Sequence, residues 1–230
     1  MKRLLTAALA AVAVCVVAGS ALAATGIKSS VIFDSTNPNG PKTNIDSYGP
    51  AAYSFTSIGD KVTFDGTARS LSNVTVTLSS WACQQGSWNG KDCLTQPGAT
   101  FSQPITLKIT NPENGETMIS TKTFDIPYRP SASAKCTDAN AGKWMTPSKV
   151  CKNGLANDVT FNLSGAKLPD TVVYEISFLT GGPADSLNVA VTDAPSVGTS
   201  TDTSLWINGA PNTDFGAYTP VVQFKAGNAS

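Results

Sequence analysis

A tryptophan in each of two polar loops is the sequence feature best suited to binding chemistry. Trp88 stands among Gln, Ser, Asn, Gly and Asp residues, and Trp144 occupies a second loop of similar character. An indole held on a rigid loop offers a flat apolar face to the C–H groups of a sugar ring, while neighbouring amides and carboxylates bind the hydroxyls. The candidate ligand-binding residues are therefore Trp88, Gln85, Asn89, Asp92 and Trp144. The alternative is that each tryptophan folds back over its own loop and forms a small satellite core.

Four cysteines bound these loops, and their spacing predicts two disulfides. Of the five cysteines, Cys15 lies in the amino-terminal leader described below, and four remain in the exported chain. An even number in an exported chain is typical of disulfide bonds, and four cysteines allow three connectivities. We expect Cys83–Cys93 and Cys136–Cys151, because each pair closes a short loop that has few apolar residues to hold it in place. Each closure contributes on the order of 2–3 kcal/mol in the chain-entropy account. The gaps between the cysteines do not match the close pairs of a zinc site, so no metal is expected.

The absence of histidine removes several classes of chemistry. The chain has 230 residues with 16 Lys and Arg, 16 Asp and Glu, and no histidine. Ser-His-Asp and Cys-His catalysis, histidine-ligated zinc and an imidazole pH switch are excluded. The balanced charge also argues against nucleic-acid binding, which needs a basic surface to neutralise phosphates. We expect no cofactor.

A carboxylate-based glycoside hydrolase is the enzymatic alternative. Such an enzyme needs two carboxyl groups at a fixed separation, one of them with its pKa raised by burial. Glu175 is the first candidate because it lies within the most apolar segment of the chain. The alternation around it nevertheless predicts that Glu175 faces solvent, while Val172, Tyr174 and Ile176 face the core. We therefore expect a protein that is not an enzyme.

A turn near the amino terminus could also be read as a cation site. Asp34, Asn37 and Asn39 offer oxygen ligands before Gly40, as calcium loops do. The pattern lacks the distal bidentate Glu of such loops, which favours a plain Asn/Asp turn.

The first 23 residues have the pattern of a secretory signal peptide. Lys2 and Arg3 precede an apolar run, and Ala21-Leu22-Ala23 is a small-x-small cleavage site. The run is shorter than the ~20 residues that span a bilayer. We expect cleavage after Ala23, secretion of residues 24–230 as a single domain, no membrane insertion afterwards, and a monomer.

Period-two alternation of apolar and polar residues predicts the elements that position these loops. The clearest alternating segments are Val74–Leu78, Ile105–Ile109, Val159–Leu163, Leu187–Val191 and Val222–Phe224. Thr171–Thr180 is apolar on both parities except at Glu175 and Ser177 and predicts a central strand, and Asn114-Gly115 predicts a hairpin turn. Ser57–Asp60 is read as a turn, and Ser148–Ala156 is the one weak helix candidate. The fold class is therefore all-β, a two-layer antiparallel β-sandwich of jelly-roll or Ig-like topology with two disulfide-closed loops.

Several segments resemble a group of exported bacterial proteins of unknown function. They are Tyr48–Phe55, Gly59–Arg69, Val74–Cys83, Pro127–Ser131, Asn153–Val159 and Leu168–Tyr174. The resemblance implies a secreted β-sandwich and no established activity. The chain is more loosely similar to the sandwich domains that bacteria display outside the cell.

Together these patterns lead us to expect a secreted, non-catalytic binding or adhesion protein that recognises an extracellular glycan or another cell-envelope component. The other class left open is a passive surface protein that binds proteins through its strand edges and loops.

Overall fold

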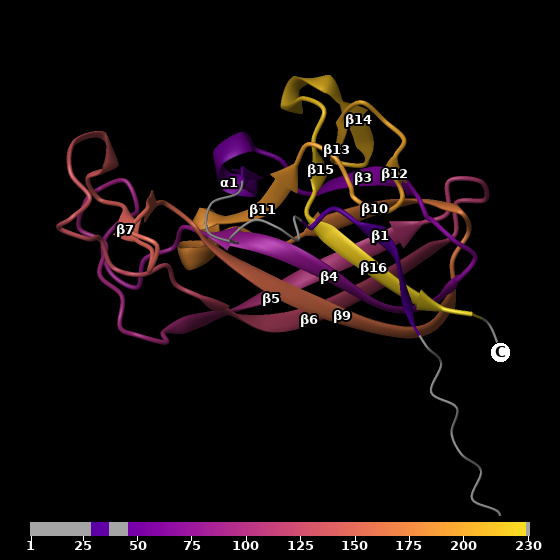
Figure 1. Cartoon of the computed structure of the whole chain (residues 1–230), viewed down its shortest axis with the longest axis horizontal. Helices are drawn as coiled ribbons and strands as arrows, with labels where there is room; N and C mark the ends of the chain where they lie inside the picture. The colour runs from indigo at the N-terminus through magenta and orange to yellow at the C-terminus, as the bar shows by residue number, and fades with distance from the viewer. Residues whose placement is uncertain (1–28, 37–45, 229–230) are drawn as a thin grey trace, which may run out of the picture.

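Two antiparallel β-sheets pack face to face and form the body of the protein (Figure 1). The computed structural model describes residues 29–36 and 46–228. Each large sheet has seven strands, and a two-stranded sheet lies beyond one end of the sandwich. The predicted antiparallel sandwich is confirmed.

The first sheet is built around β4 (Ser70–Ser80). This strand pairs along its whole length with β9 (Leu155–Lys167). Its other side pairs with β16 (Val222–Gly227) and then with β11 (Leu187–Thr192). The outer strands of this sheet are β1 (Ser30–Asp34), β2 (Ser47–Tyr48) and β15 (Thr219–Pro220).

The second sheet is built around β10 (Thr171–Ser177). It pairs with β3 (Ile58–Thr63) on one side and with β5 (Thr100–Thr110) on the other. The remaining strands are β6 (Thr117–Pro127), β12 (Thr199–Ser200), β13 (Leu205–Ile207) and β14 (Ala210–Asn212). The residues from Val172 to Ile176 are all buried, so the predicted central strand is confirmed.

The core lies between the two sheets and follows the predicted alternation. Val74, Val76 and Leu78 of β4 face Ile105 and Leu107 of β5 across a continuous apolar cluster. These side chains are essentially inaccessible to water. Their removal from water is the main source of stability for a sandwich of this kind.

Two Asn-Gly turns connect neighbouring strands. Asn114-Gly115 joins β5 to β6, with Thr110 opposite Thr117, as predicted. Asn208-Gly209 joins β13 to β14, and both residues have positive φ, 53° and 84°. A two-residue turn of this type matches the twist of the strands, which is why Asn-Gly is favoured there.

Helices are short. In the described part of the chain they are α1 (Pro50–Tyr53) and three 3₁₀ turns, η1 (Asp138–Asn140), η2 (Gly182–Ser186) and η3 (Thr213–Phe215). The predicted helix over Ser148–Ala156 is wrong. That segment contains β8 (Cys151–Lys152) and the start of β9, because Cys151 is tied to Cys136 and Leu155 pairs with Ser80.

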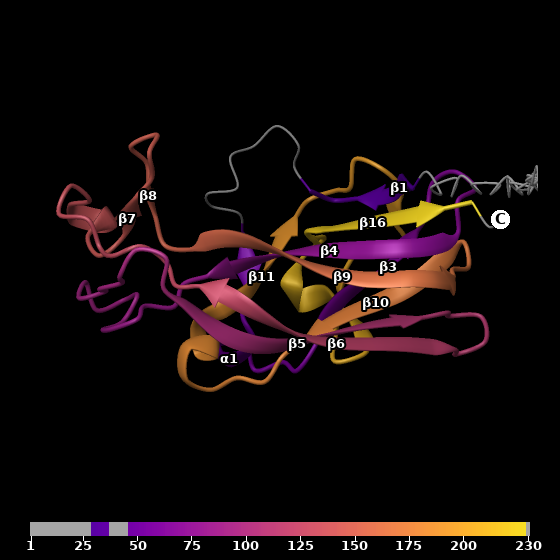
Figure 2. The same ribbon diagram turned by 90° about the horizontal axis from the view of Figure 1, so that it is seen from below.

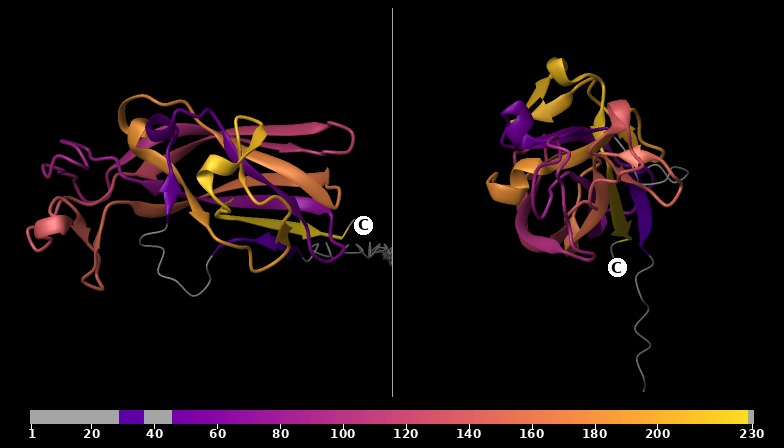
Figure 3. Two further views of the ribbon diagram at one scale, coloured as in Figure 1. Left: turned by 90° about the horizontal axis from the view of Figure 1, so that it is seen from above. Right: turned by 90° about the vertical axis from the view of Figure 1, so that its left-hand side faces the viewer.

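Both cysteine loops lie at the same end of the sandwich (Figures 2 and 3). Cys83 is bonded to Cys93 and Cys136 to Cys151, with Cα atoms 5.4 and 5.9 Å apart. The predicted pairing is confirmed. In the second loop, β7 (Trp144–Met145) pairs with β8 and forms the small third sheet.

Two sequence predictions fall on residues outside the described ranges. They concern the leader, residues 1–23, and the part of the candidate cation turn that includes Asn37 and Asn39. Asp34, which is described, accepts hydrogen bonds from Thr36 and Gln223. No helix within residues 29–36 and 46–228 is long and apolar enough to cross a lipid bilayer.

Candidate functional site

Trp88 packs against a second tryptophan at the disulfide end of the sandwich. The rings of Trp81 and Trp88 lie 4.7 Å apart in an edge-to-face arrangement at 79°. Trp81 follows β4 directly and donates its indole N–H to the Ser79 hydroxyl at 3.1 Å. Trp88 is therefore supported by Trp81 and stays partly exposed.

A cavity of about 310 Å³ opens beside this pair. We call it the end cavity. It is lined by Ala82, Cys83, Gln84, Gly86, Ser87, Trp88, Tyr128, Gly182, Pro183 and Ser186. The lining comes from the first cysteine loop, the end of β6 and η2. Residues distant in sequence thus build one concave surface.

Several polar groups of the end cavity are not used by the fold. Among the described residues, none hydrogen-bonds with Trp88 Nε1 or with the hydroxyls of Tyr128 and Ser186. The Gln84 side-chain carbonyl accepts from the Gln96 N–H at 2.9 Å, which leaves the Gln84 amide NH₂ free. The end cavity thus combines the rings of Trp88 and Tyr128 with several polar groups that make no hydrogen bond within the described residues.

The polar side chains predicted around Trp88 lie outside this cavity. Asp92 accepts a hydrogen bond from the Ser87 N–H at 2.9 Å, and Asn89 accepts one from the Ser87 hydroxyl. Gln85 is joined to Leu94 by two backbone hydrogen bonds, which makes a bridge across the loop. Asn89 and Asp92 shape the loop around Ser87, which itself lines the cavity.

Trp144 is not an exposed ligand-binding residue, and that expectation is corrected. Its side chain is 5% exposed, and its indole N–H donates to the Gly154 carbonyl at 3.1 Å. The pairing of β7 with β8 turns the ring inward. Trp144 is the small core of the second loop.

Arg129 joins the two cysteine loops from within. Its side chain is fully buried and donates to the carbonyls of Asn153 and Gly142. Its Nε–H also points at Cys93 Sγ at 3.2 Å. Burial lowers the pKa of this guanidinium, because the charged form loses hydration. Among the described residues, no carboxylate pairs with it.

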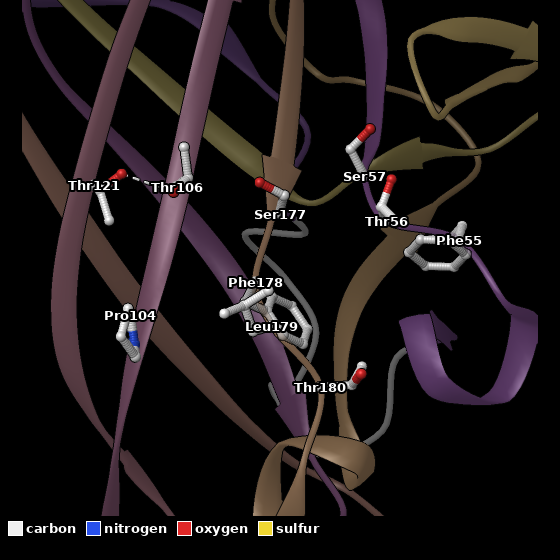
Figure 4. A pocket seen from close by; sticks show the side chains of 10 residues that line it. All are labelled: Phe55, Thr56, Ser57, Pro104, Thr106, Thr121, Ser177, Phe178, Leu179 and Thr180. Atoms are coloured by element: carbon white, nitrogen blue, oxygen red, sulfur yellow. Dashed lines mark hydrogen bonds between the residues drawn. The ribbon is translucent and has the colours of Figure 1, made fainter.

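A second, larger hollow lies on the outer side of the second sheet (Figure 4). We call it the sheet-face groove; its volume is about 500 Å³. It is lined by Phe55, Thr56, Ser57, Pro104, Thr106, Thr121, Ser177, Phe178, Leu179 and Thr180. Thr106 and Thr121 hydrogen-bond to one another across β5 and β6. The lining holds no ionisable side chain.

Glu175 lies beside this groove and does not face solvent, which corrects the prediction. Its residue exposure is 7%, and its carboxylate accepts from the Ser57 hydroxyl at 2.7 Å and pairs with Lys108 Nζ at 3.1 Å. The Asn208-Gly209 turn also lies over it, since a Cβ on Gly209 would be 3.8 Å from Glu175 Oε1. A turn distant in sequence therefore covers a position that alternation alone assigns to solvent.

Asp60 is a second buried carboxyl, on β3. It is inaccessible to water, and its Oδ2 has no hydrogen-bond partner in the described part of the chain. The pKa of Asp60 is raised to about 6: burial is the largest cause and nearby Asp202 adds to it, while hydrogen bonds from the hydroxyls of Thr219 and Ser200 partly offset the rise. The described residues contain no group of three or more metal-ligating side chains.

Comparison with family models, with curated proteins and with solved structures finds no match. Tyr128, Gln84 and Ser186 are among the cavity residues that the sequence analysis does not single out. Each belongs to a different part of the chain, and no local pattern signals that they converge.

Proposed function

We propose that the protein is a secreted, non-catalytic carbohydrate-binding protein and that the end cavity holds the sugar. The observation that carries the proposal is the position of Trp88. Its ring lines the cavity, rests on Trp81 and leaves its N–H unused. Tyr128 adds a second aromatic ring to the same cavity.

The physical argument rests on complementarity and on preorganisation. A sugar ring has apolar C–H faces and a rim of hydroxyls, which match an indole face and the free donors and acceptors around it. The Cys83–Cys93 bond closes the loop, and the Trp81 contact fixes the indole. Little conformational entropy is then lost when a ligand binds.

The surroundings of Glu175 support a non-catalytic role. A glycoside hydrolase needs a carboxyl group free to act beside a second one. Both carboxylate oxygens of Glu175 are instead engaged, one by Ser57 and the other by Lys108. The two disulfides support export, since such bonds persist in oxidising compartments outside the cytoplasm.

Affinity electrophoresis through gels that contain neutral polysaccharides, one per gel, tests the proposal. We expect at least one polysaccharide to retard the mature protein, and Trp88→Ala to weaken that retardation by at least about tenfold, as loss of a central aromatic anchor does. Trp206→Ala is the matched control, because Trp206 is also partly exposed but lies on β13, does not line the end cavity and donates its N–H to Asp202 at 2.6 Å.

Three results would overturn the proposal. Equal retardation of the Trp88 and Trp206 variants would exclude the end cavity. Turnover of a polysaccharide that disappears in Glu175→Gln would show an enzyme. Binding to envelope proteins alone would favour adhesion through β6, which pairs only with β5 among the described strands and whose Ile119 is 62% exposed.

A further inference from the structure

The two disulfides differ in what surrounds their sulfur atoms. In the first, Cys93 is 1% exposed and receives the Arg129 Nε–H at 3.2 Å, while Cys83 is partly exposed and lines the end cavity. In the second, Cys136 is 4% exposed and Cys151 is partly exposed. Both therefore pair a buried sulfur with a more accessible one.

Only the first disulfide has a cation on its buried sulfur. Within the described residues, no side chain donates a hydrogen bond to Cys136 or Cys151, although Lys135 and Lys152 are their neighbours in sequence. Arg129, in contrast, is fully buried and faces no carboxylate among those residues. The Arg129 guanidinium can thus stabilise a negative charge that develops on the Cys93 sulfur.

We propose that Cys83–Cys93 is a thiol-reducible site in which Cys83 is attacked and Cys93 leaves. A thiolate of an external dithiol attacks Cys83 Sγ and forms a new S–S bond to it. The Cys83–Cys93 bond breaks, and its electron pair stays on Cys93 Sγ as a thiolate, to which Arg129 donates its Nε–H. The second thiolate of the dithiol then attacks its partner sulfur in the mixed disulfide and releases Cys83 as a thiolate. The dithiol is oxidised to its disulfide, and the protein disulfide is reduced by two electrons.

The physical reason is the stability of the leaving group. Exchange is faster when the departing thiol has a lower pKa, and an adjacent guanidinium lowers a cysteine pKa by favouring the thiolate. The position of Cys83 at the wall of the end cavity gives a small thiol access to the sulfur that must be attacked.

Reduction would also release the loop that carries Trp88. That loop, Gln84–Asp92, is closed by this disulfide, and Trp88 is the proposed sugar anchor. This consequence rests on the proposed function: reduction would then weaken glycan binding. The sulfur chemistry itself does not depend on any ligand.

Differential alkylation of the mature protein during exposure to dithiothreitol tests the proposal. Cysteine-containing peptides are quantified by mass spectrometry at successive times, and the ratio of the two reduction rates is the readout. We expect Cys83–Cys93 to open at least about tenfold faster than Cys136–Cys151, as a drop of about two units in the leaving-group pKa would give. Arg129→Met should remove most of that difference, and Arg129→Lys should retain part of it.

Lys91→Met is the matched control, because it removes an exposed positive charge from the same loop without touching a sulfur. It should leave the ratio unchanged. A variant that loosens the whole end would speed both reductions, so the ratio separates misfolding from loss of the charge. Equal rates in the wild-type protein would overturn the proposal outright, as would an unchanged ratio in Arg129→Met. If the ratio of reduction rates were as expected but the protein bound no glycan, only the proposed function would be refuted.

Discussion

At the scale of single residues, Asp60 makes the stability of the protein depend on pH. Its pKa rises from 3.8 to about 6 on folding, mainly because burial disfavours the carboxylate. The folded state therefore binds the proton more tightly than the unfolded chain. This contribution to stability is fully present below about pH 4 and is lost as pH rises through about 6. The full change is about 3 kcal/mol.

Urea unfolding of the wild-type protein and of Asp60→Asn between pH 4 and 8 checks this prediction. The variant should be the more stable of the two near pH 8, since it carries no buried charge, and the difference should shrink towards pH 4 as Asp60 becomes protonated. The charged and titratable groups facing Asp60 are Asp202 and Tyr174, and both remain in the variant. Asp214→Asn, at an exposed position, should follow the wild-type curve. A difference that stays constant with pH would refute the role of Asp60.

Single positions were the hardest to predict from sequence. The alternation correctly assigned Val172, Tyr174 and Ile176 to the core, because their burial follows from the pleat of β10 alone. Glu175 was misplaced because its cover comes from Ser57, Lys108 and Gly209, which other strands and turns supply. Such non-local cover leaves no trace in a local pattern.

At the scale of elements, β3 requires a glycine for a reason that differs from turn formation. A Cβ on Gly59 would lie 1.7 Å from the Tyr174 carbonyl oxygen, so it would collide with the backbone of the neighbouring strand. Gly115, in the β5–β6 turn, has φ of 75°, but a Cβ added there would meet no described atom within 4 Å. One glycine allows close approach, and the other allows a left-handed conformation.

The two glycines should therefore tolerate alanine differently. Gly115→Ala should cost about 1 kcal/mol, which is the effect of positive φ alone. Gly59→Ala should cost more than about 4 kcal/mol, because β3 and β10 cannot pair at their present distance. Thermal unfolding followed by circular dichroism measures both. If Gly59→Ala unfolded at the same temperature as Gly115→Ala, the predicted collision between the Gly59 Cβ and β10 would be contradicted.

The same strand shows the limit of turn signals. Ser57–Asp60 has turn composition, yet Ile58–Asp60 begins β3. The Asn-Gly signal at 114–115 correctly predicts a hairpin, because residues 111–116 close their own loop: the Asn111 N–H donates to the Glu116 carbonyl, the Asn114 side chain accepts from the Glu116 N–H, and Gly115 has positive φ. Ile58 and Gly59 are instead held in a strand because Gly59 pairs with Glu175 of β10 on one side and with Trp206 of β13 on the other.

At the scale of the whole molecule, the cysteine loops form an end that is separate from the sheets. The main apolar cluster includes none of the four cysteines and neither Trp88 nor Trp144. Replacing Cys136 and Cys151 together by serine should therefore cost about 2–3 kcal/mol through loop entropy, without loss of the sandwich.

Hydrogen exchange followed by mass spectrometry separates local from global effects in this double variant. Protection should fall in residues 130–153 and persist in β4, β5 and β10. Loss of protection in β10 would show that the second loop is part of the cooperative core.

The sandwich and both disulfides could be predicted from the sequence, because alternation and cysteine spacing are local patterns. The end cavity could not be predicted, because it forms only where β6, η2 and the first cysteine loop meet.

The placement of the end cavity also decides how the protein should be attached to a surface. β16 ends at Gly227 on the side of the sandwich opposite β7 (Figure 1). A carboxy-terminal tether would thus hold the molecule upright on a sensor chip, with Trp88 directed into the flowing solution. Coupling through amines would give mixed orientations, because Lys91, Lys135 and Lys143 lie in the segments around the cysteines while Lys61 and Lys225 lie on β3 and β16. The molecules coupled through the first group would have the cavity against the matrix, and the signal of a true ligand would be reduced accordingly.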